Sequence, residues 1–169
     1  LALAYSSATT TVATVAGNVV TIVGAGSSVI TASQGGNSEY DAATNASQTL
    51  TVNKAAATVT LAGLTPTFDN TSKAVTATTS PASLPVTITY AGSATAPTAA
   101  GSYAVVATVT SANHVGSANG TLVIGKANQT ITFGTLSQKL FSDPAFTLSA
   151  TASSSLPVSY ASSSAAVAT

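Results

Sequence analysis

Apolar residues along this chain fall in short clusters in which they alternate with polar residues. The clusters are rich in β-branched side chains and are closed by Gly, Asn, Ser or Pro. Alternation with a period of two residues is typical of β-strands with one buried face. No long stretch carries a helical stripe, so we expect an all-β chain. The clearest predicted strands are residues 18–24, 28–33, 48–52, 57–63, 85–92, 102–110, 120–125 and 129–134.

Residues 54–125 are predicted to form one complete antiparallel sandwich, which we call the middle module. The segment opens and closes on a strand, and its turn signals recur at the interval expected of a β-sandwich. Alternation along each strand predicts which side chains face inward. The expected core consists of Val59, Leu61, Val75, Val86, Ile88, Val105, Ala107, Val109, Leu122 and Ile124.

The two ends of the chain carry similar sequences, LALAYSSATTTVAT at 1–14 and LPVSYASSSAAVAT at 156–169. An internal repeat explains this similarity, because the shared residues keep one gap-free offset of 155 residues. The matched pairs include Leu1 with Leu156, Tyr5 with Tyr160, Val12 with Val167 and Thr14 with Thr169.

The repeat predicts that a second sandwich is split between the two ends. Residues 1–53 would supply its closing strands, and residues 126–169 its opening strands; we call these segments the closing half and the opening half. Joined through the overlap they give about 80 residues, a suitable size for an immunoglobulin-like sandwich. The expected fold is therefore a tandem of immunoglobulin-like antiparallel β-sandwiches, one complete module flanked by two half-modules. The short lysine-bearing junctions predict a stiff array.

Three segments resemble known repeat families. VATVAGNVVTIVG and the residues after it, at 12–43, resemble the second half of a bacterial immunoglobulin-like (Big-type) repeat, and residues 127–169 resemble the first half of one. TLAGLTPTFDNTSK and its continuation, at 60–124, resemble the MBG-type repeat of large bacterial surface proteins. The resemblance implies export, a tandem arrangement and an extracellular or cell-surface location. It names no ligand, because such repeats serve as stalks, spacers and adhesins.

Charge is scarce, with four lysines, four acidic residues, one histidine and no net charge. Only 5% of the residues are charged, against about 25% in an average soluble domain. Such a surface repels other copies weakly and offers no basic patch, so it permits association and argues against nucleic acid. The chain contains no cysteine, which excludes disulfides and Cys-ligated zinc. Its apolar runs are too short to span a bilayer. Because it begins with leucine and carries no signal segment, we expect it to belong to a longer protein.

Two tyrosines occupy positions that a sandwich can use structurally. Tyr103 follows the TAAGS turn at the entry to a long strand, where its phenol can bond to the backbone as in a tyrosine corner. Tyr40, after GGNSE, is a candidate for the same part in the split sandwich.

The titratable residues do not form a recognisable active site. His114 lies in SANHVGSANG, where an exposed loop position is expected, and Glu39, Asp41, Asp69 and Asp143 are too scattered for paired acid–base chemistry. We expect Asp69 and Asp143 to cap amides in turns. No catalytic, cofactor-binding or metal-binding residue is assigned, although calcium at a junction through Glu39 or Asp41 stays open.

Three further motifs have simple structural interpretations. GAGSS at 24–28 lacks the lysine of a phosphate loop and is expected to be a hairpin turn. Lys54 and Lys126 lie at junctions, where an isopeptide crosslink would need a buried lysine beside an acid. Glycosylation is an open alternative at the N-x-[ST] triplets that begin at Asn45, Asn70, Asn119 and Asn128.

Three classes of function compete: a structural protein, an adhesin and an enzyme. The absence of clustered acids and histidines argues against an enzyme, and the absence of tryptophan argues against sugar recognition. We therefore expect a structural segment of an extracellular filament, sheath or stalk, without catalytic activity or cofactor. Its partners would be further copies or adjacent repeats, head to tail, joined covalently or by strand complementation. An adhesin that binds a glycan or host surface through its loops is the alternative.

Overall fold

The computed structural model describes residues 1–164 and 167 and confirms the predicted all-β, sandwich-type architecture. Every regular element in this part of the chain is a strand, so there is no helix here that could cross a membrane. The chain divides into two compact units, Leu1–Gly125 and Lys126–Thr169. The predicted division into three domains stays a prediction. Ala165, Ala166, Ala168 and Thr169, which belong to the predicted terminal repeat, lie outside the described residues.

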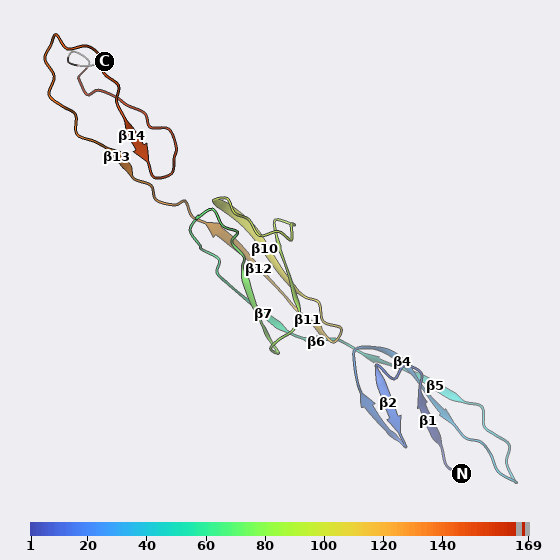
Figure 1. Ribbon diagram of the computed structural model, residues 1–169. Helices are drawn as coiled ribbons and strands as arrows, with labels where there is room; N and C mark the ends of the chain where they lie inside the picture. The colour runs from blue at the N-terminus through green and yellow to red at the C-terminus, as the bar shows by residue number, and fades with distance from the viewer. Residues whose placement is uncertain (165–166, 168–169) are drawn as a thin grey trace. The chain divides into compact units, whose positions relative to one another are not determined.

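The closing half contains two small antiparallel sheets (Figure 1). Three strands pair in the order β1-β4-β5, and β2 pairs with β3. The bounds are β1 Ala4–Ser7, β2 Ala13–Ala16, β3 Val19–Ile22, β4 Gly26–Ser33 and β5 Ala46–Val52. On β3 the apolar side chains remain exposed, with Val19 at 60% and Ile22 at 54%.

The middle module also has two layers in addition to a short junction sheet. Hairpin β7–β8 packs on the sheet β12-β10-β9, and β6 pairs in parallel with β11. The bounds are β6 Ala55–Ala56, β7 Thr58–Ala62, β8 Thr76–Ser80, β9 Val86–Tyr90, β10 Gly101–Val109, β11 His114–Val115 and β12 Ser117–Ile124.

The predicted core of the middle module is confirmed. Six of its ten predicted residues are buried, and the other four are half-buried on the inner side. Tyr90, a tyrosine outside the ten residues of the predicted set, completes the cluster: it is 6% exposed, and the Val75 amide donates to its phenol oxygen over 2.8 Å. Partnering the hydroxyl removes the penalty of burying it. The buried members of the predicted set are Val75, Val105, Ala107, Val109, Leu122 and Ile124.

The opening half has only one small hairpin among its described residues. Strand β13, Ile131–Phe133, pairs with β14, Ala150–Ala152. No second layer covers this hairpin within the described part of the unit, and its apolar side chains remain exposed. The described part of this unit therefore has one two-stranded sheet with exposed apolar side chains.

The hairpin turn predicted for residues 24–28 is wrong. Gly24 and Ala25 form a bend between β3 and β4, which belong to different sheets, so the bend carries the chain from one layer to the other. Gly26 has φ +141°, and a Cβ at this position would lie 2.8 Å from Val12 Cγ2. The glycine is therefore required by both backbone conformation and space.

Asn113 bonds both to the closing half and to the start of the middle module. The Asn113 carbonyl accepts from the Ala55 amide over 2.9 Å, and its side-chain Oδ1 accepts from the Ala25 amide over 2.9 Å. Lys54 Nζ donates to the Ser111 carbonyl over 2.9 Å. A shallow cavity of about 210 Å³ lies beside these contacts, lined by Ile22, Val23, Gly24, Ala25, Val52, Asn53, Ala55, Asn113 and His114.

Candidate functional site

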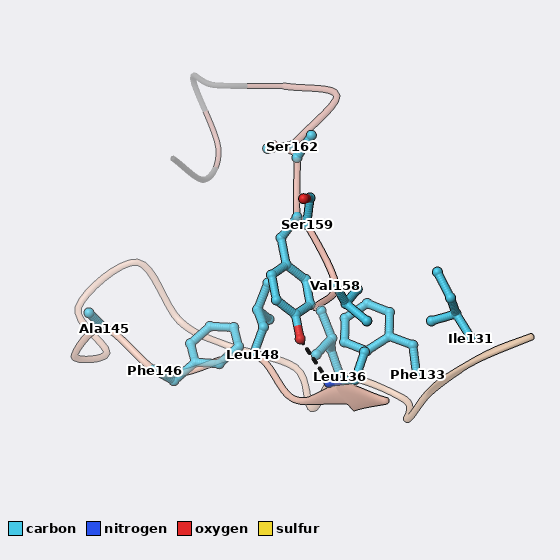
Figure 2. A pocket seen from close by; sticks show the side chains of 12 residues that line it. Ile131, Phe133, Leu136, Ala145, Phe146, Leu148, Val158, Ser159 and Ser162 are labelled. Carbon is cyan, nitrogen blue, oxygen red and sulfur yellow. Dashed lines mark hydrogen bonds between the residues drawn. The ribbon is translucent and has the colours of Figure 1, made fainter. Parts of the chain in front are cut away.

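An open apolar groove of about 680 Å³ lies in the opening half. It is built by β13, by β14 and by the two irregular segments that precede and follow β14 (Figure 2). Carbon dominates its lining, because hydroxyls come only from two serines and one tyrosine. The lining residues are Ile131, Phe133, Leu136, Ala145, Phe146, Leu148, Ala150, Val158, Ser159, Tyr160, Ala161 and Ser162.

Tyr160 is held in the groove by two contacts. Its phenol oxygen accepts a hydrogen bond from the Ala150 amide over 2.8 Å, the dashed line in Figure 2. Its ring lies 5.9 Å from that of Phe133, centroid to centroid, with the planes inclined at 58°. This tilted arrangement is favourable for two aromatic quadrupoles. Tyr160 therefore joins the irregular terminal segment to both strands of the hairpin.

The groove is open to solvent despite its apolar character. Ile131 is 62% exposed, Phe133 47% and Phe146 51%. A neighbouring cation, Lys139 Nζ, lies 5.1 Å from the centroid of the Phe146 ring, in cation–π range. Clustered exposure of large apolar side chains marks an interaction surface in a soluble protein. The partner that this chemistry favours is an apolar, uncharged surface.

The tyrosine corner predicted at Tyr103 is confirmed. Its phenol donates to the Ala99 carbonyl over 3.0 Å, which ties the start of β10 to the preceding turn. The same role for Tyr40 is wrong, because its side chain is 68% exposed and its phenol has no hydrogen bond to any described residue. Tyr40 lies in the loop between β4 and β5, outside the strand that a corner would need.

His114 is not in an exposed loop as predicted. It lies in β11, half-buried, with Nδ1 3.4 Å from the Ser111 hydroxyl, because the chain after β10 turns back to pair with β6. Over residues 1–164 and 167, no three His, Asp or Glu side chains gather as metal ligands. Glu39, one of the two calcium candidates, instead accepts from the Asn37 and Ser38 side chains.

The two turn aspartates cap amides as predicted. Asp69 accepts from the Thr71 amide over 2.9 Å, and Asp143 accepts from the Leu140 amide over 3.0 Å. The hydrogen bond from Lys73, at 2.5 Å, and those from Thr71 lower the pKa of Asp69 to about 2. Asp69 and Lys73 therefore form a local ion pair on an exposed turn.

The lysines and asparagines singled out in the sequence lie on the surface. Lys54 and Lys126 are exposed, so neither provides the buried amine that an isopeptide crosslink requires. The four N-x-[ST] asparagines are also exposed, which leaves glycosylation there sterically open: Asn45, Asn70, Asn119 and Asn128.

The groove itself could not be predicted from the sequence, since it depends on how β13, β14 and Tyr160 come together. A signal was nevertheless present. Ser-Leu-Pro-Val occurs at 83–86 in the middle module and again at 155–158, with a tyrosine shortly after each copy, at Tyr90 and Tyr160.

Comparison with known proteins gives a family match for the middle of the chain. A search of curated proteins gave no match for the chain. Residues 57–128 match the family model of the MBG domain, which confirms the resemblance predicted for residues 60–124. The Big-type resemblance of the two halves stays a prediction. The middle segment is therefore similar to the MBG domain, a domain typical of secreted and surface proteins of bacteria.

Proposed function

We propose that this chain is a structural repeat segment of an extracellular bacterial filament, sheath or stalk. Copies join head to tail, and the neighbouring repeat completes each split, Big-like sandwich. The observation that carries this proposal is the open apolar groove of the opening half, in which Phe133 is 47% exposed on a layer without an opposing sheet. Covering such a face with apolar surface stabilises a complex by about 25 cal/mol per Å² buried.

The closing half also has an apolar surface that it does not cover itself. Its β3 presents exposed Val19, Val20 and Ile22, and its three-stranded sheet carries an inner face that the closing half alone covers only in part. Opening and closing halves are different surfaces, so the contact between them is heterologous. A heterologous contact that does not close into a ring propagates as a filament. The low charge of the chain removes the repulsion that would oppose such packing.

The proposed role is structural and not catalytic. The polar residues that are candidates for catalysis make local structural contacts instead. Tyr103 bonds to the Ala99 carbonyl, Asp69 accepts from the Thr71 amide in a turn, and His114 lies within a short strand. The resemblance to a domain of bacterial surface proteins supports an extracellular location.

Electron microscopy of the purified 169-residue chain tests this function. We expect unbranched filaments, and we expect Phe133→Asp to abolish them because it places a charge on the apolar face. Thr132→Asp is the matched control, since Thr132 is exposed on the opposite side of β13 and its replacement leaves filaments intact. Isolated particles from the unaltered chain, together with binding to a glycan array, would favour the adhesin and overturn the structural role.

A further inference from the structure

The middle module shows how an opening layer and a closing layer fit together. In this module the hairpin β7–β8 packs on the sheet β9-β10-β12, with Leu61 of β7 against a core that includes Leu122 and Ile124. The opening half repeats the first layer, as hairpin β13–β14, and the closing half repeats the second, as sheet β1-β4-β5. The opening half thus matches the first layer of the middle module, and the β1-β4-β5 sheet of the closing half matches the second.

The sequence register supports this equivalence at two places. Leu84-Pro85-Val86 recurs 72 residues later as Leu156-Pro157-Val158. The serine before each copy has positive φ, 64° at Ser83 and 59° at Ser155, so the backbone conformation recurs as well. In the closing layers, Thr-Leu at 121–122 stands 72 residues after Thr-Leu at 49–50.

Strand pairing gives the same register independently. Gly26 of β4 lies opposite Val52, as Gly101 of β10 lies opposite Ile124. With β4 and β10 aligned on these glycines, the position of Ile88, opposite Ala107, is occupied in the closing half by Tyr5, opposite Ala32.

The two repeated tyrosines therefore share one structural position. Tyr160 stands 72 residues after Ile88 in sequence, and Tyr5 matches Ile88 by pairing. A complete sandwich has room for only one strand at this position. Tyr5 belongs to β1, which forms a four-residue ladder with β4, whereas Tyr160 lies outside any strand.

Matched core positions are more exposed in the two halves than in the middle module. Leu122 and Ile124 are 0% and 2% exposed in the middle module, but the matching Leu50 and Val52 are only half-buried. Leu61 is half-buried, but the matching Phe133 is 47% exposed. Positions that are covered by the opposite layer in the middle module are thus more exposed in both halves. Separating the two layers of one sandwich would have this effect.

We infer that the sheet β1-β4-β5 of a second copy covers the groove of the opening half, in the register of the middle module. The inference rests on the proposed function and specifies its interface. Phe133 packs beside Gln48 of the second copy, as Leu61 lies beside Gly120. A Cβ at Gly120 would be only 3.0 Å from Leu61 Cδ1, so the larger pair Gln48 and Phe133 needs the two layers to lie further apart than in the middle module. Tyr5 of the second copy replaces Tyr160 on Phe133 and on the Ala150 amide.

Disulfide trapping tests this register cleanly, because the chain contains no cysteine. Full-length chains that carry only Gln48→Cys or only Phe133→Cys are mixed, allowed to assemble and oxidised. We expect a dimer in which peptide mass spectrometry finds a 48–133 disulfide, because in the template a Cβ at the position of residue 48 lies beside the side chain at the position of residue 133. Thr49→Cys mixed with Phe133→Cys is the matched control and should not crosslink, because residue 49 points to the other face.

A second pair of variants tests the tyrosine exchange without altering Phe133. We expect Tyr5→Phe to weaken association about fivefold, the effect of one lost hydrogen bond, and Tyr160→Phe to leave it unchanged or stronger. Filaments that form without a 48–133 crosslink, or that respond equally to both tyrosine variants, would overturn this register but leave the proposed function standing. A chain that forms neither filaments nor crosslinks would overturn both.

Discussion

Leu122 lies at the centre of the only complete sandwich in the described part of the chain, so its truncation measures how strongly two joined layers are held. Its side chain is 0% exposed and packs in one cluster with Val75, Tyr90, Val105 and Ile124. Replacing a buried leucine by alanine costs about 2–5 kcal/mol, from lost burial and from the cavity left behind. For a domain of this size, with an m-value of about 3 kcal/mol/M in guanidinium chloride, a loss of ~3 kcal/mol lowers the unfolding midpoint by about 1 M.

Equilibrium unfolding in guanidinium chloride, followed by far-ultraviolet circular dichroism, measures this shift for Leu122→Ala. Val123→Ala is the matched control: Val123 is the next residue of β12, faces outward and is 46% exposed. Its replacement should cost about 0.5 kcal/mol or less, which is typical of surface positions. Equal midpoints for the two variants would refute the assignment of Leu122 to the inner face, and with it the use of the middle module as a template.

Three further predictions concern single polar contacts. Tyr103→Phe removes the corner hydrogen bond and should destabilise the middle module by about 1 kcal/mol in the same unfolding assay. The pKa of Asp69 is lowered to about 2, so its interaction with Lys73 stabilises the fold fully above pH 4 and is lost as the pH falls toward 2; melting curves should show that Asp69→Asn lacks this pH dependence. Asn113→Ala should accelerate hydrogen exchange at the Ala25 amide, whose acceptor it removes, and unchanged exchange would contradict the contact.

The strands that the sequence predicted share a visible property, namely β-branched apolar residues at alternate positions. All eight predicted clusters contain a strand. Strands such as β8, TATTS at 76–80, were missed because their side chains are small or hydroxylated and give no hydrophobic contrast. Strand β11 was missed because its pairing with β6, distant in sequence, decides its structure. Local patterns therefore predicted the strands that bury large side chains, and tertiary pairing decided the others.

The site was predictable in outline and not in detail. The repeat at the chain ends predicted an uncovered face on the opening half, and Tyr103 could be placed in a corner from the turn before it. The hydrogen bond of Tyr90 could not be predicted, because the partner of its phenol is the Val75 amide, contributed by another segment. The hydrogen bond of Tyr160 could not be predicted for the same reason, since it depends on β14 lying beside this residue. Hydrogen bonds to distant backbone amides leave no local sequence pattern.

Sedimentation velocity of the 169-residue chain tests the central claim most directly, because it asks whether the exposed face of the opening half is covered by another copy. The mass of one chain is 16.3 kDa. We predict a series of species at multiples of this mass that grows with protein concentration, and we predict that Leu50→Asp, which charges the matching face of the closing half, returns the chain to monomer. A stable monomer at every concentration, with both terminal segments folded on their own, would contradict it.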